Sequence, residues 1–333
     1  PIPYYVDGVN PSAVDNALKD IEANTCVRFK KSGRFSDRAG LRYFVGNGCY
    51  SMIGRVEKNK PQEVSIGRGC EMAGIVQHET LHALGFFHEQ SRPDRDQYLS
   101  IAVNNVSPNQ RHNYLIHNSD ESDTLGIPYN YGSAMQYDKK AFASNNKVVM
   151  ITKNQLYQDS IGNKARLAFL DFKAVNNAYC SKKCKGGVRC SNGGYEDPNK
   201  CGVCKCPYLL TGKTCTEYIQ NKSPGCDGKS VITLSSSPVT VKPKGKIECV
   251  YTIKASGSKK IKVTFGKANQ IARGEACYAN DALEIQYLND KTLGGVFKCG
   301  QPKGSITSEG PLMLVKFNGQ SNYNFAELTF SAA

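Results

Sequence analysis

Three of the chain's five histidines lie close together, in the segment His78-Glu79-Thr-Leu-His82-Ala-Leu-Gly85-Phe-Phe-His88. His78 and His82 are four residues apart, so on a helix their imidazoles lie on one face and can bind the same ion. Gly85 can adopt the left-handed conformation that ends a helix, which allows His88 to approach that ion from another direction. Three neutral imidazoles leave a zinc ion an open position for water and lower the pKa of that water toward neutrality. Glu79 lies beside the first ligand, where it can accept a proton from the water.

Two other interpretations of this segment are weaker. A helix with unrelated surface histidines would have no reason to carry Glu79 and Gly85 at the positions that the chemistry requires. A structural zinc site normally has four protein ligands with cysteine among them, and no cysteine lies near these histidines. We therefore expect a hydrolytic site with one catalytic Zn²⁺, with Glu79 as the general base and the three histidines as ligands.

The cysteine content indicates the cellular compartment. The chain has fourteen cysteines, and six of them lie between Cys184 and Cys215. An oxidising compartment would join such a cluster into disulfides, whereas a reducing one would leave thiols or a metal site. The triplets that begin at Asn105 and Asn221 fit N-glycosylation sequons, although such triplets are common by chance. We expect a secreted, extracellular glycoprotein.

Composition and charge exclude several classes of protein. Hydrophobic residues make up 40% of the chain and charged residues 22%, which is a globular balance. No apolar run approaches the roughly 20 residues of a membrane helix, so we expect no membrane span. The chain opens at Pro1 without a basic and apolar leader, so we expect no signal peptide within it. The net charge of +14 favours acidic partners, but the basic residues are scattered without a nucleic-acid-reading motif, so we expect no nucleic acid.

Composition also divides the chain into three domains. Residues 1–180 mix strand-like and helix-like stretches, with an amphipathic helix expected over Ala13–Ala23. Residues 181–216 are rich in Gly and Cys and too short to fold without staples. A linker is expected over 217–225, and residues 226–333 alternate apolar and polar side chains as strands of an all-β antiparallel sandwich do. The clearest of these runs are Lys260–Phe265, Ala282–Tyr287, Leu312–Phe317 and Phe325–Phe330.

The histidine segment with a later methionine is the metzincin signature, and residues 2–180 resemble one family of metzincins, the astacins. The motifs that carry this resemblance are His88-Glu89-Gln-Ser-Arg92-Pro-Asp94-Arg95-Asp96, Ser133-Ala-Met135-Gln-Tyr137, Asn24-Thr-Cys26-Val-Arg28-Phe29 and the loop from Gly48-Cys49 to Gly69-Cys70. The resemblance implies an α+β catalytic domain and a secreted zinc metalloendopeptidase that is made as a zymogen.

The resemblance also implies roles for individual residues. Met135 looks like the Met-turn residue that packs beneath the histidines, and Tyr137 looks like an extra zinc ligand that later stabilises the oxyanion. Lys164 and Arg166 fall where the family often has basic residues lining the primed-side specificity pocket, which would attract an acidic side chain just after the scissile bond. The alternative for the latter two is a solvated charge pair on a loop.

Disulfide pairs follow from the resemblance rather than from spacing, which alone would allow three pairings of the first four cysteines. In the catalytic domain the implied pairs are Cys26–Cys180 and Cys49–Cys70. Residues 184–215 resemble an EGF-like module, for which Cys206–Cys215 is expected and the other pairs stay open. A zinc-binding cysteine cluster is the less favoured alternative.

Residues 226–333 resemble a CUB domain through Cys249-Val-Tyr-Thr-Ile253, Cys277 to Asp281-Ala-Leu-Glu-Ile285 and Cys299-Gly300. The implied pairs are Cys226–Cys249 and Cys277–Cys299. Some CUB domains bind Ca²⁺, for which Glu275 and Asp281 are weak candidates. The order astacin, EGF-like, CUB is typical of nematode astacins.

The expected function is hydrolysis of peptide bonds in extracellular proteins. The tail domains are expected to bind substrate, matrix or acidic glycans. The alternatives are a passive tail, or a binding protein whose protease domain is a relic.

Overall fold

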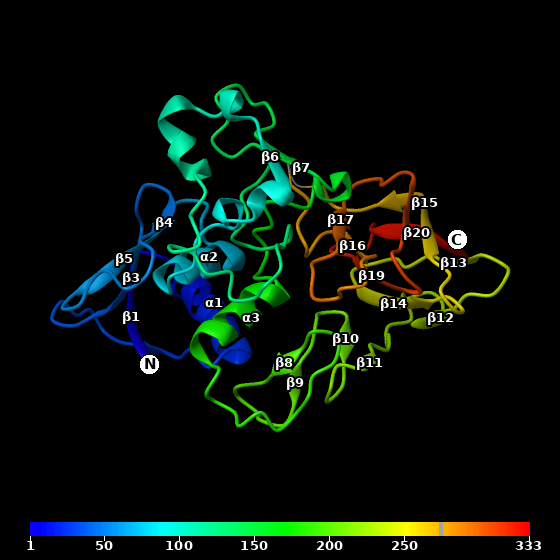
Figure 1. The fold of residues 1–333 in the computed structure, drawn as a ribbon, viewed down its shortest axis with the longest axis horizontal. Coiled ribbons are helices and arrows are strands. Elements are labelled where there is room, and N and C mark those ends of the chain that lie inside the picture. The colour runs from blue at the N-terminus through cyan, green and yellow to red at the C-terminus, as the bar shows by residue number, and fades with distance from the viewer. Residues whose placement is uncertain (273–275) are drawn as a thin grey trace.

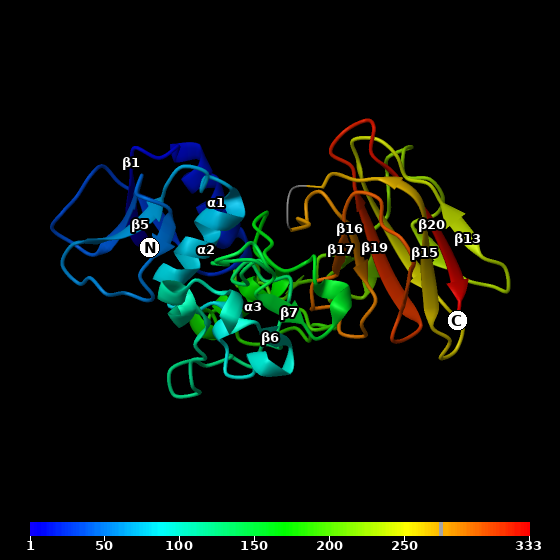
Figure 2. The same ribbon diagram turned by 90° about the horizontal axis from the view of Figure 1, so that it is seen from above.

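The computed structural model describes residues 1–272 and 276–333. Residues 1–180, which the sequence predicts to be catalytic and which we call the catalytic part, contain the three α-helices of the described residues and lie at one end of the molecule in Figure 1, with a β-sandwich at the other end. Four short strands within residues 195–218 belong to a small module between them. In the view of Figure 2 the catalytic part and the sandwich are two lobes that meet near β16 (Leu283–Gln286) and β17 (Val296–Lys298). The fold class expected from the sequence, α+β followed by a disulfide-rich module and a β-sandwich, is confirmed.

A five-stranded sheet in the order β2-β1-β3-β5-β4 forms one side of the catalytic part. Its strands pair in parallel except β4, which is antiparallel to β5 and lies at the edge of the sheet. The strands are β1 (Ile2–Asp7), β2 (Phe29–Lys31), β3 (Gly40–Phe44), β4 (Cys49–Ser51) and β5 (Pro61–Ile66).

Helix α1 (Pro11–Asn24) packs on this sheet and on helix α2 (Ala73–Ala83). It begins at Asn10, whose side chain accepts a hydrogen bond from the backbone N–H of Ser12, and proline occupies the first helical position, where it loses no hydrogen bond. The amphipathic helix expected over Ala13–Ala23 is confirmed, because the residues of its apolar face are buried: Val14, Ala17, Leu18 and Ile21.

The second half of the catalytic part is mostly turns, short helices and one two-stranded sheet, and it ends in helix α3 (Phe169–Tyr179). The short elements are η1 (Glu89–Ser91), η2 (Arg95–Gln97), β6 (Leu99–Ile101), η3 (Val103–Asn105), η4 (Pro108–Tyr114), β7 (Met150–Thr152) and η5 (Gln155–Tyr157). The described residues contain no helix that is long and apolar enough to cross a membrane.

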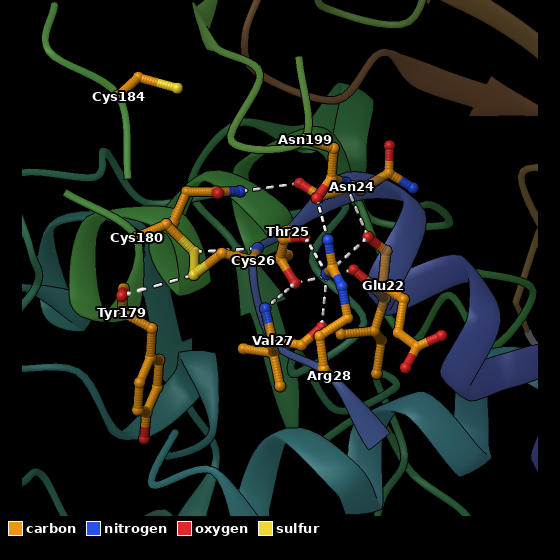
Figure 3. The surroundings of a disulfide bond; sticks show 12 residues. Glu22, Asn24, Thr25, Cys26, Val27, Arg28, Tyr179, Cys180, Cys184 and Asn199 are labelled. Atoms are coloured by element: carbon orange, nitrogen blue, oxygen red, sulfur yellow. Dashed lines mark hydrogen bonds between the residues drawn. A yellow bond between two sulfur atoms is a disulfide. The ribbon is translucent and has the colours of Figure 1, made fainter. Parts of the chain in front are cut away.

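A disulfide between Cys26 and Cys180 ties the chain just after α1 to the end of α3 (Figure 3). The small module contacts the same corner. Asn199 donates a hydrogen bond to the backbone oxygen of Glu22 over 2.9 Å, and it accepts one from Arg28. The module is therefore anchored to the catalytic part by polar contacts as well as by the chain itself.

The small module consists of two hairpins stapled by three disulfides, in the crossed order that an EGF-like module would have. Its strands are β8 (Tyr195–Glu196), β9 (Cys204–Lys205), β10 (Leu210–Thr211) and β11 (Glu217–Tyr218), and β11 falls in the segment expected to be a linker. All fourteen cysteines are paired: Cys26–Cys180, Cys49–Cys70, Cys184–Cys201, Cys190–Cys204, Cys206–Cys215, Cys226–Cys249 and Cys277–Cys299.

The sandwich has two sheets, β12-β14-β19-β16-β17 and β13-β20-β15-β18, packed face to face over a core of aliphatic and aromatic side chains. Its strand pairs are antiparallel except β12 with β14. The four alternating runs of the sequence fall on β15, β16, β19 and β20. The strands are β12 (Val231–Thr233), β13 (Val239–Val241), β14 (Glu248–Lys254), β15 (Ile261–Asn269), β16 (Leu283–Gln286), β17 (Val296–Lys298), β18 (Ser305–Thr307), β19 (Leu312–Asn318) and β20 (Phe325–Ala332).

Candidate metal centre and substrate cleft

Three imidazoles converge at the end of helix α2. His78 and His82 lie on the helix, which ends before Gly85, and Gly85 has a φ of +99° that few other residues adopt without strain. The chain turns there, and the Nε2 atom of His88 comes to 3.2 Å from that of His78 and 3.0 Å from that of His82. Tetrahedral zinc with Zn–N bonds of about 2.1 Å separates its ligand nitrogens by about 3.4 Å. The donor set therefore fits one zinc ion.

Backbone carbonyls fix which nitrogen of each helical histidine faces the centre. The Nδ1 atom of His78 donates to the oxygen of Ala134, and that of His82 to the oxygen of Phe86, both over 2.7 Å. Each Nε2 is thereby left with its lone pair directed at the shared point. Burial lowers the pKa of His78 to about 3 and that of His82 to about 4, so both imidazoles are neutral and ready to ligate.

A buried carboxylate, Asp171 on α3, holds the turn that runs beneath the histidines. It accepts hydrogen bonds from the Ser133 hydroxyl (2.6 Å) and from the backbone N–H groups of Ala134 (2.9 Å) and Ala168 (2.8 Å). The backbone oxygen of Ala134 also accepts the hydrogen bond from His78. Asp171 therefore helps to orient His78 by holding Ala134 in place. Met135 is 4% exposed and belongs to the core that includes α2.

The sequence analysis missed Asp171. The available signal was a single acid among apolar residues, Phe169-Leu-Asp-Phe172, at the start of a helix. A carboxylate in the first turn of a buried helix is placed to accept from its N-terminal N–H groups. Its link to the turn at Ala134 depends on tertiary packing, which the sequence pattern does not reveal.

Glu79 and Tyr137 face the same cleft as the histidines. The cleft has a volume of about 480 Å³ and is lined by these five side chains together with Tyr50 and Lys164, among others. Glu79 is 4% exposed, its Oε2 atom has no hydrogen-bond partner among the described residues, and burial raises its pKa to about 8. The ring of Tyr137 lies 4.3 Å from that of His88, and burial, with the nearby charge of Glu79, raises the pKa of its phenol.

The two basic residues expected in the specificity pocket point in different directions. Lys164 lines the cleft, whereas Arg166 does not. The Arg166 guanidinium lies 3.9 Å above the ring of Tyr208 in the small module and 3.9 Å from the carboxylate of Glu284 in the sandwich. The expectation that Arg166 faces the cleft together with Lys164 is not met in the structure, because aromatic and anionic partners from the two tail domains engage its guanidinium.

Comparison with protein-family models decides the family. Residues 1–180 match the family model described as Astacin, a family of peptidases, and these residues are more than half of the chain. The chain belongs to the astacin family. Residues 228–332 match the CUB domain model, so the sandwich is a CUB domain.

Curated relatives are zinc metalloproteinases of nematodes. Zinc metalloproteinase nas-34 of Caenorhabditis elegans is 37% identical over all of this chain and 56% of its own length. Zinc metalloproteinase nas-37 of the same organism is 38% identical over 93% of this chain and 39% of its own length. The chain thus spans about half or less of the length of these relatives. Among solved structures, high choriolytic enzyme 1, a hatching-enzyme zinc protease of the medaka Oryzias latipes, is 32% identical with a TM-score of 0.48, covering 54% of this chain and 88% of that one.

The two sequon asparagines both donate their side-chain amides to backbone oxygens. Asn105 donates to Val148 over 2.8 Å. Asn221 pairs with Val250 twice, since its Oδ1 accepts from the N–H (2.8 Å) and its Nδ2 donates to the carbonyl (2.9 Å). Asn221 therefore fastens the segment before the CUB domain to strand β14.

Of the two residues expected to bind Ca²⁺ in the CUB domain, the structure describes one. Asp281 is buried in the loop before β16, and Glu275 lies outside the described residues. Calcium binding by the CUB domain remains an expectation.

Proposed function

We propose that this chain is a secreted zinc endopeptidase that hydrolyses peptide bonds of extracellular proteins. The observation that carries the proposal is the convergence of three imidazoles on one point in a cleft that Glu79 and Tyr137 also line. Membership of a peptidase family supports it. The seven disulfides are consistent with an extracellular location.

In the proposed reaction each of these residues of the cleft has its own role. His78, His82 and His88 would hold the zinc ion, which would supply a Lewis acid and lower the pKa of a bound water. The nearby charge of the bound metal would favour the ionised form of Glu79, whose carboxylate accepts the proton of the attacking water and later gives it to the leaving amine. The Tyr137 phenol donates a hydrogen bond to the oxyanion of the tetrahedral intermediate. Burial of both side chains strengthens these interactions, since little water competes for them.

For the tail domains we propose binding of acidic partners, such as matrix proteins or acidic glycans. Residues 181–333 contain 22 Lys and Arg against 11 Asp and Glu, whereas residues 1–180 contain 21 against 18. The excess positive charge therefore lies in the tail, where it would hold the protease near a polyanion without occupying the cleft.

Metal removal tests the proposed function. The secreted chain is assayed on an unstructured protein such as casein, as isolated, after chelation of zinc, and after zinc is returned. We expect hydrolysis that is lost on chelation and recovered with about one zinc per chain. Full zinc loading without hydrolysis would contradict the proposal and would leave binding by the tail as the function.

A further inference from the structure

One loop of the astacin domain connects the cleft to the CUB domain. This loop, residues 158–168, runs from the end of η5 to the start of α3. Lys164 in its middle lines the cleft. Arg166, two residues later, points away from the cleft toward Glu284 of the CUB domain. Side chains that face the substrate and the CUB domain are thus separated by a single residue.

Backbone groups of the CUB domain hold the same loop at three further points. One of these points is Asn163, whose side chain also shapes the turn around Lys164. It accepts a hydrogen bond from the N–H of Ala165 (3.1 Å) and donates one to the backbone oxygen of Arg166 (3.1 Å). The three hydrogen bonds run from Cys277 N to Asp159 O (2.9 Å), from Phe297 N to Ser160 Oγ (2.9 Å) and from Ala279 N to Asn163 Oδ1 (3.5 Å).

Glu284 is a buried carboxylate whose Oε2 atom faces this loop. It is 2% exposed, and its Oε1 atom accepts from Gly295 N and Gln286 Nε2 within the CUB domain. Its Oε2 atom has no hydrogen-bond partner among the described residues and lies 3.9 Å from Arg166. A buried carboxylate without a cation is strongly unfavourable, so Glu284 favours the arrangement that keeps Arg166 beside it.

The other side of the loop is fixed to the helix that carries the histidines. Leu167 N donates to the side chain of Gln77, which precedes His78, over 3.1 Å. The loop also packs closely on α2 at Gly74, where a Cβ atom would lie 2.4 Å from the backbone oxygen of Lys164. The loop is therefore clamped between α2 and the CUB domain, and its shape depends on both.

We propose that Glu284 of the CUB domain is a positioning residue that, through Arg166, sets where Lys164 stands in the cleft. The CUB domain thereby determines how strongly the protease prefers an acidic side chain just after the scissile bond. This inference rests on the proposed function for its readout of selectivity, but the contact itself can be tested without turnover.

The test compares two carboxamide variants of the full chain. Glu284→Gln removes the charge that faces Arg166 and keeps the side-chain shape. Glu327→Gln is the matched control, because it removes a CUB carboxylate that pairs with Lys242 on the other sheet, away from the loop. Each is assayed on two peptides that differ only in Asp or Asn after the scissile bond, and hydrogen exchange is measured over residues 158–168.

We expect Glu284→Gln to lower the Asp/Asn ratio of kcat/KM about three- to tenfold, the range of coupling through a shared element. In Glu284→Gln, turnover of the Asn peptide stays within about twofold and hydrogen exchange in the loop rises. In Glu327→Gln, both the Asp/Asn ratio and the loop exchange stay unchanged. Arg166→Gln, which removes the other partner of the contact, lowers the Asp/Asn ratio by a similar factor. The double variant Arg166→Gln with Glu284→Gln lowers the ratio no further than either single variant. A merely structural role would lower turnover of both peptides alike.

An unchanged Asp/Asn ratio in Glu284→Gln overturns the inference, whatever the exchange shows. Equal loss on both peptides, or the same shift in Glu327→Gln, also overturns it. If the unaltered chain shows no zinc-dependent hydrolysis, the proposed function fails separately. Loop exchange then decides the contact alone, and a lack of difference between Glu284→Gln and Glu327→Gln refutes it.

Discussion

Replacing Asp171 tests whether the histidine centre depends on the turn beneath it. Asp171→Ala removes the acceptor for two buried backbone N–H groups and for the Ser133 hydroxyl. Asp171→Asn keeps the shape and one acceptor oxygen. The Ser133 hydroxyl can reverse and accept from the new amide, so that both backbone donors keep a partner.

The number and kind of the hydrogen bonds lost give the expected losses of stability and of zinc affinity. Leaving a buried donor without a partner costs about 1–3 kcal/mol, so two backbone groups make Asp171→Ala cost about 2–6 kcal/mol. Asp171→Asn exchanges charged for neutral hydrogen bonds and costs about 1–2 kcal/mol. Since Ala134 orients His78, we also expect zinc to bind about 10- to 100-fold more weakly to the alanine variant.

Helix circular dichroism measures this effect selectively, because the α-helices of the described residues all lie in the catalytic part. Denaturant unfolding is followed at the helix band, and zinc affinity is measured by competition with a chelating dye. Asp159→Asn is the control, since its carboxylate is 60% exposed and pairs with Lys139, an interaction worth at most about 1 kcal/mol. Surface substitutions usually change the free energy of unfolding by less than about 0.5 kcal/mol. If the free energy of unfolding of Asp171→Ala lay within that range of the control's, the reasoning would be refuted.

Two further substitutions test single contacts. Tyr137→Phe removes the hydrogen bond proposed for the oxyanion, so we expect kcat to fall about 100-fold with little change in KM; an equal rise in KM would assign Tyr137 to substrate binding instead. Asn221→Ala removes both bonds to Val250 and should destabilise the CUB domain by about 1–2 kcal/mol in thermal unfolding. A glycan on Asn221 would add bulk at an Nδ2 atom that lies 2.9 Å from the carbonyl oxygen of Val250, so we expect peptide mapping to find Asn221 unmodified; a glycan there would show that the contact tolerates this bulk.

The sequence was most informative where the chemistry is local. The spacing of His78 and His82 and the glycine at position 85 follow from helix geometry, and the alternation in β15, β16, β19 and β20 follows from strand geometry. The partners of Asp171 and Arg166 could not be predicted in the same way. Glu284 is separated from Arg166 by 118 positions in the chain, and only the packing of three domains brings them together. Resemblance placed Arg166 in the specificity pocket, whereas tertiary contacts direct it to the CUB domain.

The most direct test of the central claim is hydrolysis by Glu79→Gln loaded with zinc. The glutamine preserves the volume of the side chain but cannot accept the proton of the attacking water. We expect zinc content equal to that of the unaltered chain and hydrolysis lower by about 10²- to 10⁴-fold, the usual contribution of a general base. Near-normal hydrolysis by the zinc-loaded variant would contradict the account of the cleft given above.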